Sequence, residues 1–320
     1  MAVYTEVGDE DLVAFVAQYD IGEALSATGI VEGVENSNYL LSTTVGNFIL
    51  TLYENRVHSA DLPFFLGLKE HLAAKGIACP VPVRARDGEM LHKLSNRQAA
   101  IVTFLAGMWP RRIQPYHCGE LGRALALMHL AGNDFALRRS NDLSVQSWRS
   151  LLCRSADRAD EVQQGLAEDL ETELAALELN WPDTLPCGII HADLFPDNVF
   201  FRGPELTGLI DFYFACTDMF AYDIAICMNA WCFEADGSFN VTKAKRLLTA
   251  YGRVRDFSDD ELAALPVLAR GAAMRFLLTR LYDWLYTPAD ALVTKKDPLE
   301  HWKRLQFHQR VTGPQDYGLV

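Results

Sequence analysis

The sequence lacks the features that mark three large classes of protein. Basic charge is scarce: 29 Lys and Arg stand against 42 Asp and Glu, a net charge of −13. A nucleic-acid surface needs clustered basic side chains, so none is expected. The seven cysteines include no CxxC pair, which argues against a zinc cluster or a disulfide framework. No basic leader and no stretch near the ~20 apolar residues that span a bilayer is visible, so we expect a cytoplasmic protein without a membrane partner.

The sequence pattern changes along the 320 residues from mostly strand-like to mostly helical. The first third has short β-branched or aromatic segments separated by Gly and Asn, with two helical stretches. After residue 104 the chain is mostly helical to about residue 310, interrupted by one strand pair. The expected strands are 29–34, 39–42, 48–53, 89–94, 99–104, 188–190 and 198–210, and the clearest helices are 9–19, 61–75 and 115–130.

This pattern predicts an α+β fold with two lobes. We expect a small antiparallel-sheet lobe at residues 1–102, a hinge at 103–108 and a larger helical lobe at 109–320. The chain is long enough for each lobe to bury a core. A cleft between lobes is a favoured place for a ligand.

The most informative residues are in two nearby segments, IIHADLFPDNVFF at 189–201 and GLIDFY at 208–213. Asp193 follows the first apolar piece, Asn198 comes five residues later, and Asp211 ends the last piece. An Asp or Asn near a Pro is commonly only a turn residue. Phosphoryl transfer, however, needs a carboxylate that orients and deprotonates a hydroxyl and hard oxygen ligands for magnesium, in this order along the chain.

HADLFPDN and IDF resemble the catalytic and metal motifs of the aminoglycoside phosphotransferase and choline kinase superfamily, which is similar to the protein kinases. The segment 116–130 resembles the helix that enters the large lobe of these enzymes. The resemblance implies a kinase-like fold that uses ATP and Mg²⁺. It assigns Asp193 as the catalytic base, Asn198 and Asp211 as magnesium ligands, and His191 as a support of the catalytic loop. A buried core histidine is the alternative for His191.

The nucleotide-binding residues that the resemblance implies are less distinctive. GVENSNY at 33–39 takes the place of the glycine-rich loop but lacks the GxGxxG spacing. Backbone amides and polar side chains would have to hold the phosphates there; an ordinary polar hairpin is the alternative. The residues placed over the phosphates are Asn36, Ser37 and Asn38, and those at the adenine-contacting hinge are Val102, Thr103 and Phe104.

One departure concerns the lysine that the third strand of the small lobe normally carries for the phosphates. That strand reads NFILTLY at 47–53, with Thr51 at the position of the lysine. The helix that should supply the glutamate partner reads LPFFL at 62–66. The absence of the lysine explains the absence of the glutamate, because a buried glutamate without its lysine would be an unpaired charge. A nucleotide-binding regulator without catalysis, or a structural adaptor, remains an alternative.

The same departure narrows the resemblance. FILTLYE, LPFFLGLKEHLAAKGI, HADLFPDNVFF, IDFYFACTD and NAWCF together resemble the homoserine kinase family of bacteria, in which threonine commonly replaces that lysine. The likeness runs from about residue 4 to about residue 310. It implies transfer of the γ-phosphate of ATP to homoserine in threonine biosynthesis. Choline, methylthioribose or an aminoglycoside are alternative substrates, and the oligomeric state stays open.

An amino-acid substrate needs groups that bind its ammonium and its carboxylate near the catalytic aspartate. A bidentate arginine suits the carboxylate, although a buried arginine on an apolar helix also pairs with a neighbouring aspartate. Carboxylates at a helix start are often structural, and aromatic residues often only pack in the core. The candidates are Asp197, Asp218 and Asp223 for the ammonium, Arg275 and Arg280 for the carboxylate, and Trp231 and Phe233 as pocket walls.

Overall fold

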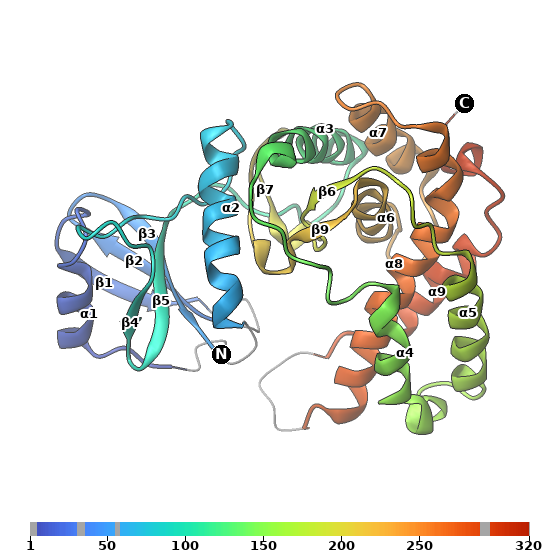
Figure 1. The fold of residues 1–320 in the computed structure, drawn as a ribbon, viewed down its shortest axis with the longest axis horizontal. Helices are drawn as coiled ribbons and strands as arrows, with labels where there is room; N and C mark the ends of the chain where they lie inside the picture. The colour runs from blue at the N-terminus through green and yellow to red at the C-terminus, as the bar shows by residue number, and fades with distance from the viewer. Residues whose placement is uncertain (1–4, 31–35, 55–57, 289–294, 320) are drawn as a thin grey trace. The chain divides into compact units, whose positions relative to one another are not determined.

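The computed structural model describes residues 5–30, 36–54, 58–288 and 295–319 and divides the chain into two units (Figure 1). Unit 1 comprises Met1–Gly107 and Thr207–Tyr213, and unit 2 comprises Met108–Leu206 and Phe214–Val320. The chain first passes from unit 1 to unit 2 between Gly107 and Met108, at the end of the hinge that we expected at 103–108. The segment 207–213, which we expected in the large lobe, belongs to unit 1.

Close backbone contacts explain why the segment 207–213 joins unit 1. The backbone N–H of Leu209 donates to the carbonyl of Ala78 at 2.9 Å. A Cβ on Gly208 would lie 2.5 Å from Leu105 Cδ1, so a larger residue here would require the Leu105 side chain to shift. The chain thus returns to the sheet-bearing unit for seven residues.

Unit 1 is built on a five-stranded antiparallel sheet with the order β1-β2-β3-β5-β4. Side chains alternate between buried and partly exposed along β2, the pattern of a sheet with one covered face. In the register of β2 and β3, Asn38 lies opposite Thr51. The elements of this unit are α1 (Asp9–Val16), β1 (Ala24–Gly29), β2 (Ser37–Thr43), β3 (Asn47–Tyr53), α2 (Leu62–Ala74), β4 (His92–Leu94) and β5 (Arg97–Thr103). The strand expected at 29–34 is therefore β1, five residues earlier at its start, and residues 31–35 lie outside the described part.

Unit 2 is mostly helical and contains the short strand pair β6 with β9; a second pair, β7 with β8, ends where the chain passes into unit 1 at Thr207. Every residue of α6 is buried, because its sequence is apolar almost all round and other elements surround it. Helix α3 packs on α7, and α8 packs on both α6 and α9 (Figure 1). The helices are α3 (Pro115–Ala131), α4 (Val145–Cys153), α5 (Leu166–Asn180), α6 (Phe220–Trp231), α7 (Val241–Gly252), α8 (Asp259–Tyr286) and α9 (Leu299–His308), and the strands are β6 (Cys187–Ile190), β7 (Val199–Arg202), β8 (Glu205–Leu209) and β9 (Cys216–Met219).

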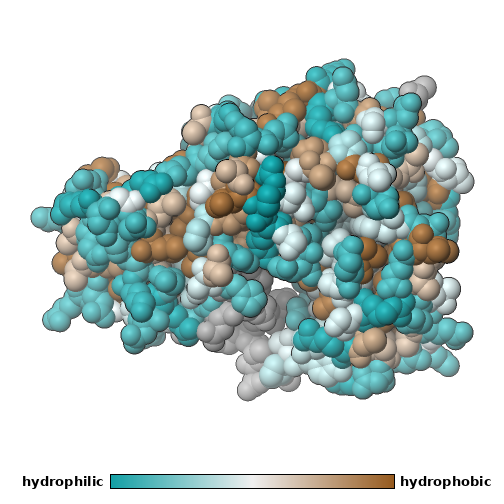
Figure 2. Space-filling view, in the orientation of Figure 1, coloured by the Kyte–Doolittle hydropathy of each residue, from teal (hydrophilic) through white to brown (hydrophobic). Residues whose placement is uncertain are grey.

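Helix α8 corrects one expectation about apolar segments. Among the described residues it is the one helix whose length and composition would let it cross a membrane, although we expected no such stretch. The interior of the protein covers 61% of its most apolar window, as in the core helix of a folded domain. The face seen in Figure 2 is mainly hydrophilic, with hydrophobic residues in small separate groups.

Candidate active site

The segment between β6 and β7 forms a tight loop that brings the predicted base and one predicted metal ligand together. The side-chain amide of Asn198 donates to the Asp193 backbone carbonyl at 2.8 Å and to Asp193 Oδ2 at 3.2 Å. Both bonds use Nδ2, so the carbonyl oxygen of the Asn198 side chain points elsewhere. Asp193 is half-buried and Asn198 is buried. The five-residue spacing thus lets the Asn198 amide nitrogen orient the Asp193 carboxylate, while the amide oxygen of Asn198 remains available on the same loop.

The backbone of this loop is held by the carboxylate of Asp223, in the first turn of α6. Asp223 Oδ2 accepts the backbone N–H of His191 at 2.7 Å, and Oδ1 accepts that of Ala192 at 2.9 Å. Ala192 has φ +62°, a left-handed conformation that an alanine adopts only when its surroundings impose it. On the other side, the guanidinium of Arg275 donates to the Ala192 carbonyl at 2.6 Å.

Trp231, at the end of α6, completes the support. Its indole Nε1–H donates to the backbone carbonyl of Leu194 at 2.7 Å. Asp223, Arg275 and Trp231 are 0%, 1% and 0% exposed. We predicted all three to contact substrate, but the structure covers each of them and directs a polar atom of each to the backbone of the loop. Their placement supports a positioning role.

His129, near the end of α3, belongs to the same buried network and was missed in the sequence. Its Nε2 lies 3.1 Å from Asp223 Oδ2 and its Nδ1 lies 2.8 Å from the Tyr251 hydroxyl. Burial lowers the pKa of His129, so the neutral ring donates from Nε2 to the carboxylate. Burial alone would raise the pKa of Asp223, but the hydrogen bonds from His129 and the His191 backbone hold it below its usual value. The Met-His pair that ends the predicted helix was the available signal.

Asp218 has another surrounding. It is half-buried in β9, its Oδ2 accepts from the side-chain amide of Asn141 at 2.7 Å, and its Oδ1 accepts the backbone N–H of Met219 at 2.8 Å. Burial raises the pKa of Asp218. These partners satisfy the carboxylate within the protein, so the structure lends no support to an ammonium-binding role.

Asp211, the second predicted metal ligand, lies in unit 1 and is exposed. Its φ of +63° is again left-handed, a conformation that clusters at functional sites. Two residues on, the Tyr213 hydroxyl lies 3.3 Å from that of Tyr53. Lys69 of α2 is buried with its ammonium 5.4 Å from the centre of the Tyr213 ring. Burial lowers the pKa of Lys69 to about 8, and the nearby charges of Cys79 and Asp211 act against this shift.

The polar side chains predicted to hold phosphates are largely engaged within unit 1. Asn36 Oδ1 accepts from the backbone of Glu54 at 3.3 Å, and the Ser37 hydroxyl donates to the Glu54 carboxylate at 2.7 Å. Asn38 Oδ1 accepts from the Thr51 hydroxyl at 2.8 Å. Residues 33–35 of the predicted loop lie outside the described residues. Within unit 1, Asn36 and Asn38 thus use their acceptor oxygens, and Ser37 uses its hydroxyl donor.

At the predicted hinge, the backbone N–H of Thr103 donates to the Val81 carbonyl at 2.9 Å, and its hydroxyl accepts from the Val81 N–H at 2.9 Å. Phe104 is exposed. Thr103 is therefore held by Val81 at the end of β5, and Phe104 is the first exposed residue after the strand.

The donor set fits magnesium better than a transition metal. In the described ranges no group of three His, Cys, Asp or Glu side chains could hold a metal ion. Magnesium takes oxygen ligands, keeps several waters and shares phosphate oxygens, so one carboxylate and one amide oxygen from the protein suffice. Asp211 and Asn198 are residues of these types.

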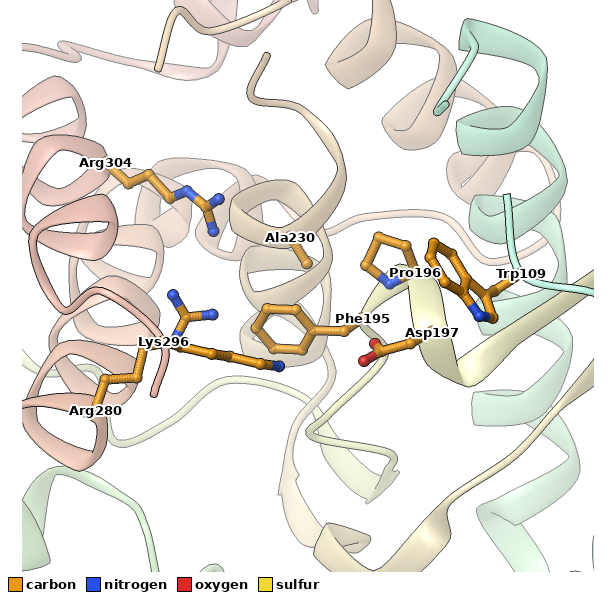
Figure 3. Close-up of a pocket in the computed structure, with 8 residues that line it drawn as sticks. All are labelled: Trp109, Phe195, Pro196, Asp197, Ala230, Arg280, Lys296 and Arg304. Atoms are coloured by element: carbon orange, nitrogen blue, oxygen red, sulfur yellow. The ribbon is translucent and has the colours of Figure 1, made fainter. Parts of the chain in front are cut away.

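A cavity of about 300 Å³ opens in unit 2 next to the loop between β6 and β7 (Figure 3). Phe195, Pro196 and Asp197 line it from the loop, and three cationic side chains approach from the opposite side, as Figure 3 shows. The complete lining is Trp109, Phe195, Pro196, Asp197, Ala230, Arg280, Lys296 and Arg304. Asp197 and Arg280 were predicted; Lys296 and Arg304 were not.

Known proteins share both the sequence and the fold. Residues 26–257 match the sequence model described as "Phosphotransferase enzyme family". The chain is 62% identical to the homoserine kinase of Paramagnetospirillum magneticum, with 100% of each sequence covered. It is also 62% identical to the homoserine kinase of Rhodospirillum rubrum, covering 100% of this chain and 99% of the relative.

Solved structures at low identity have the same fold. An amicoumacin kinase superposes with a TM-score of 0.70 at 15% identity, covering 94% of this chain and 93% of the other. Choline kinase from Cryptosporidium parvum gives 0.68 at 14% identity, with 95% of each chain covered. The chain therefore belongs to the phosphotransferase enzyme family and has its two-lobed, kinase-like α+β fold. Within that family it belongs with the homoserine kinases.

Proposed function

We propose that the protein transfers the γ-phosphate of ATP to the side-chain hydroxyl of L-homoserine, giving O-phospho-L-homoserine for threonine biosynthesis. The observation that carries the proposal is the continuity of the catalytic loop with the cavity. Asp193 and Asn198 are joined by a hydrogen bond, and residues 195–197 between them line a pocket with both cationic and anionic groups. The full-length identity to homoserine kinases supports the same reaction.

In this proposal each residue of the loop has one task. Asp193 orients the substrate hydroxyl and accepts its proton as the new oxygen–phosphorus bond forms. Asn198 fixes Asp193 through its Nδ2, and its side-chain oxygen, together with the carboxylate of Asp211, would hold Mg²⁺. Bound magnesium would neutralise the charge on the phosphates. Asp223, Arg275 and His129 keep the loop in place, while His191 lies buried within it.

The charge of the pocket argues against the other alcohols considered. Choline and aminoglycosides are cations, and three of the eight lining residues carry positive charge against one carboxylate. Like charges at short range in a partly desolvated site cost binding free energy. Methylthioribose carries no charge that these residues would recognise. A zwitterion with a terminal hydroxyl suits the lining better.

The test is magnesium-dependent ATP turnover with a panel of L-homoserine, choline, methylthioribose and an aminoglycoside. We expect saturable turnover with homoserine alone, and loss of that turnover in Asp193→Asn with the fold retained. Turnover with choline or an aminoglycoside but none with homoserine would overturn the substrate. Tight nucleotide binding without turnover of any alcohol would favour the non-catalytic regulator that Thr51 suggested.

A further inference from the structure

The pocket concentrates positive charge to an unusual degree for a protein with a net charge of −13. Arg280 comes from α8, Arg304 from α9 and Lys296 from the segment before α9, so three separate stretches of chain deliver cations to one cavity. Figure 3 shows the three on one side of the pocket and Asp197 on the other. Charges of one sign gathered this way repel one another unless an anion joins them.

The protein itself supplies only part of the compensating charge. Arg280 donates to the carboxylate of Glu300 at 2.8 Å. Neither Lys296 nor Arg304 forms an ion pair in the part of the chain that the structure describes. They lie instead near aromatic rings: Lys296 is 5.8 Å from the centre of Phe195, and Arg304 is 5.5 Å from that of Phe233. Two cations of the pocket thus remain without a carboxylate.

The pKa values of Arg304 and His301 are lowered by the same excess of positive charge. Burial, and then the charge of Arg280, lower the pKa of Arg304 to about 10. His301, fully buried on α9 with its ring stacked on Phe276, has a pKa far below its usual value because of burial and the charges of Arg280, Arg304 and Lys296. His301 is therefore neutral and cannot add to the charge. A bound anion would relieve the repulsion.

We infer that Arg280, Lys296 and Arg304 form a carboxylate subsite that selects α-amino acids among the alcohols this enzyme could phosphorylate. The inference rests on the proposed function and specifies its substrate recognition. Asp197, across the pocket, binds the substrate ammonium. Because Asp197 and Asp193 are on one loop, a short amino acid held by its two charged groups directs its side-chain hydroxyl toward Asp193.

The experiment compares L-homoserine with L-homoserinol, in which a CH₂OH replaces the carboxylate, and with 4-hydroxybutyrate, which lacks the ammonium. The enzyme variants are Lys296→Met, Arg304→Gln and, as a matched control, Arg310→Gln at an exposed site just beyond α9. Lys296 is exposed, so its variant should fold normally. Each variant's thermal melting and its KM for ATP are measured alongside.

We expect Lys296→Met and Arg304→Gln to raise the KM for homoserine on the order of 10–100-fold, with the KM for ATP unchanged. Turnover of homoserinol should stay at its low wild-type level, so the preference for homoserine collapses. Arg310→Gln should behave as wild type. Equal use of homoserine and homoserinol by the wild-type enzyme, or an unchanged KM in both variants, would overturn the subsite. Absence of any homoserine turnover in the wild type would instead overturn the proposed function.

A second inference, from unit 1, rests on different residues. Lys69 of α2 is 4% exposed, and in the described residues it has no ion-pair partner. Its ammonium lies over the ring of Tyr213, and the charge of Asp211 is close enough to act on its pKa. An unpaired buried ammonium costs stability, so its presence calls for a compensating role.

Lys69 also lies on the helix that should have carried a glutamate. Kinases place the phosphate-binding lysine on the third strand and its glutamate partner on this helix. Here the strand has Thr51, which donates to Asn38 across β2 and β3. Tyr213 links the two elements, since its ring lies beneath Lys69 of α2 and its hydroxyl lies 3.3 Å from that of Tyr53 on β3, two residues beyond Thr51. We infer that α2 supplies, through Lys69, the cation for the nucleotide phosphates that β3 lacks.

Binding of Mg–ADP and an ATP analogue, measured by calorimetry, tests this inference without turnover. Lys69→Met should weaken binding about 10-fold or more while raising the melting temperature, because it removes an unpaired buried charge and keeps the volume. Lys75→Met, exposed at the end of the same helix, is the control. The double variant Thr51→Lys/Lys69→Glu, which installs the usual pair, should recover part of the affinity. Unchanged affinity in Lys69→Met, or a lowered melting temperature with a proportionate loss of binding, would refute the role.

Discussion

The carboxylate of Asp223 accepts the backbone N–H of Ala192 at 2.9 Å, and Ala192 has φ +62°. A left-handed alanine costs roughly 1–2 kcal/mol relative to the usual conformation. Asp223 offsets that cost from inside α6, while Arg275 holds the carbonyl of the same residue. The conformation of the loop at residues 191–192 is therefore held by a buried carboxylate in α6.

Asp223→Asn should destabilise unit 2 by about 3–5 kcal/mol, since the amide cannot accept at both positions and leaves a buried backbone N–H unpaired. Urea unfolding followed by tryptophan fluorescence measures this loss. Asp218→Asn is the matched control, because the half-buried Asp218 has fewer partners and should lose only about 1 kcal/mol. A loss of stability in Asp223→Asn no larger than in the control would contradict the proposed role of Asp223 in holding the loop backbone.

Asp193→Asn should lower kcat about 10²–10⁴-fold, because the amide cannot take the proton of the substrate hydroxyl. The Kd for Mg–ATP should stay within about threefold of wild type, since the proposed role is confined to the transition state. Steady-state kinetics and calorimetry give the two values. A Kd that weakens as much as kcat falls would assign Asp193 to nucleotide binding.

Asn198→Ala should raise the magnesium concentration needed for half-maximal activity about 10-fold or more, because it removes an oxygen ligand. It should also lower kcat at saturating magnesium, since Asp193 loses the hydrogen bond from Nδ2 at 3.2 Å. A magnesium titration of the initial rate separates the two effects. Unchanged magnesium dependence together with a lowered kcat would leave Asn198 with the positioning role alone.

Acid should destabilise unit 2 through His308. Its pKa is lowered to about 3 by burial and by the charge of Arg304. Its Nδ1 lies 2.9 Å from the Tyr317 hydroxyl, and its Nε2 has no hydrogen-bond partner among the described residues. The unfolded chain binds a proton near pH 6.5 and the folded one does not, so stability is full above about 6.5 and falls as the pH drops toward 3.

The contribution of His308 can be isolated with His308→Gln, which does not titrate. Between pH 7.5 and 5.5 the wild type should lose about 1.4 kcal/mol more unfolding free energy than the variant. Urea unfolding at both pH values gives the difference. Identical pH dependence in the two proteins would show that folding leaves the pKa of His308 unchanged, contrary to this prediction.

The site could be predicted from sequence where it depends on local spacing. The hydrogen bond between Asp193 and Asn198 follows from five residues of one loop, and the helix over 61–75 ends at Gly76 with φ +85°, as its cap position requires. Lys296 and Arg304 could not be predicted, because a lone charged residue in a loop or on an amphipathic helix is ordinarily a solvated one. Lys296 approaches Phe195 and Arg304 approaches Phe233, and these contacts depend on how α8 and α9 pack.

Other residues that we predicted to contact substrate are buried in the structure. Asp223, Arg275 and Trp231 drew notice as charged or aromatic groups near the motif, but burial decides whether such a group meets a ligand or a backbone amide. Burial depends on how α6 and α8 pack, which the residue pattern does not report. Thr51 posed the opposite difficulty: its departure was plain, while the compensating Lys69 lay on another element.

The return of residues 207–213 to unit 1 has a consequence for synthesis in the cell. The sheet and its helix leave the ribosome within the first 107 residues, but their last segment, which carries Asp211, emerges only after about two thirds of the chain has been made. Nascent domains otherwise tend to fold in order from the N-terminus. Here the sheet can form early, but unit 1 gains its last segment only after about half of the helical unit has been translated.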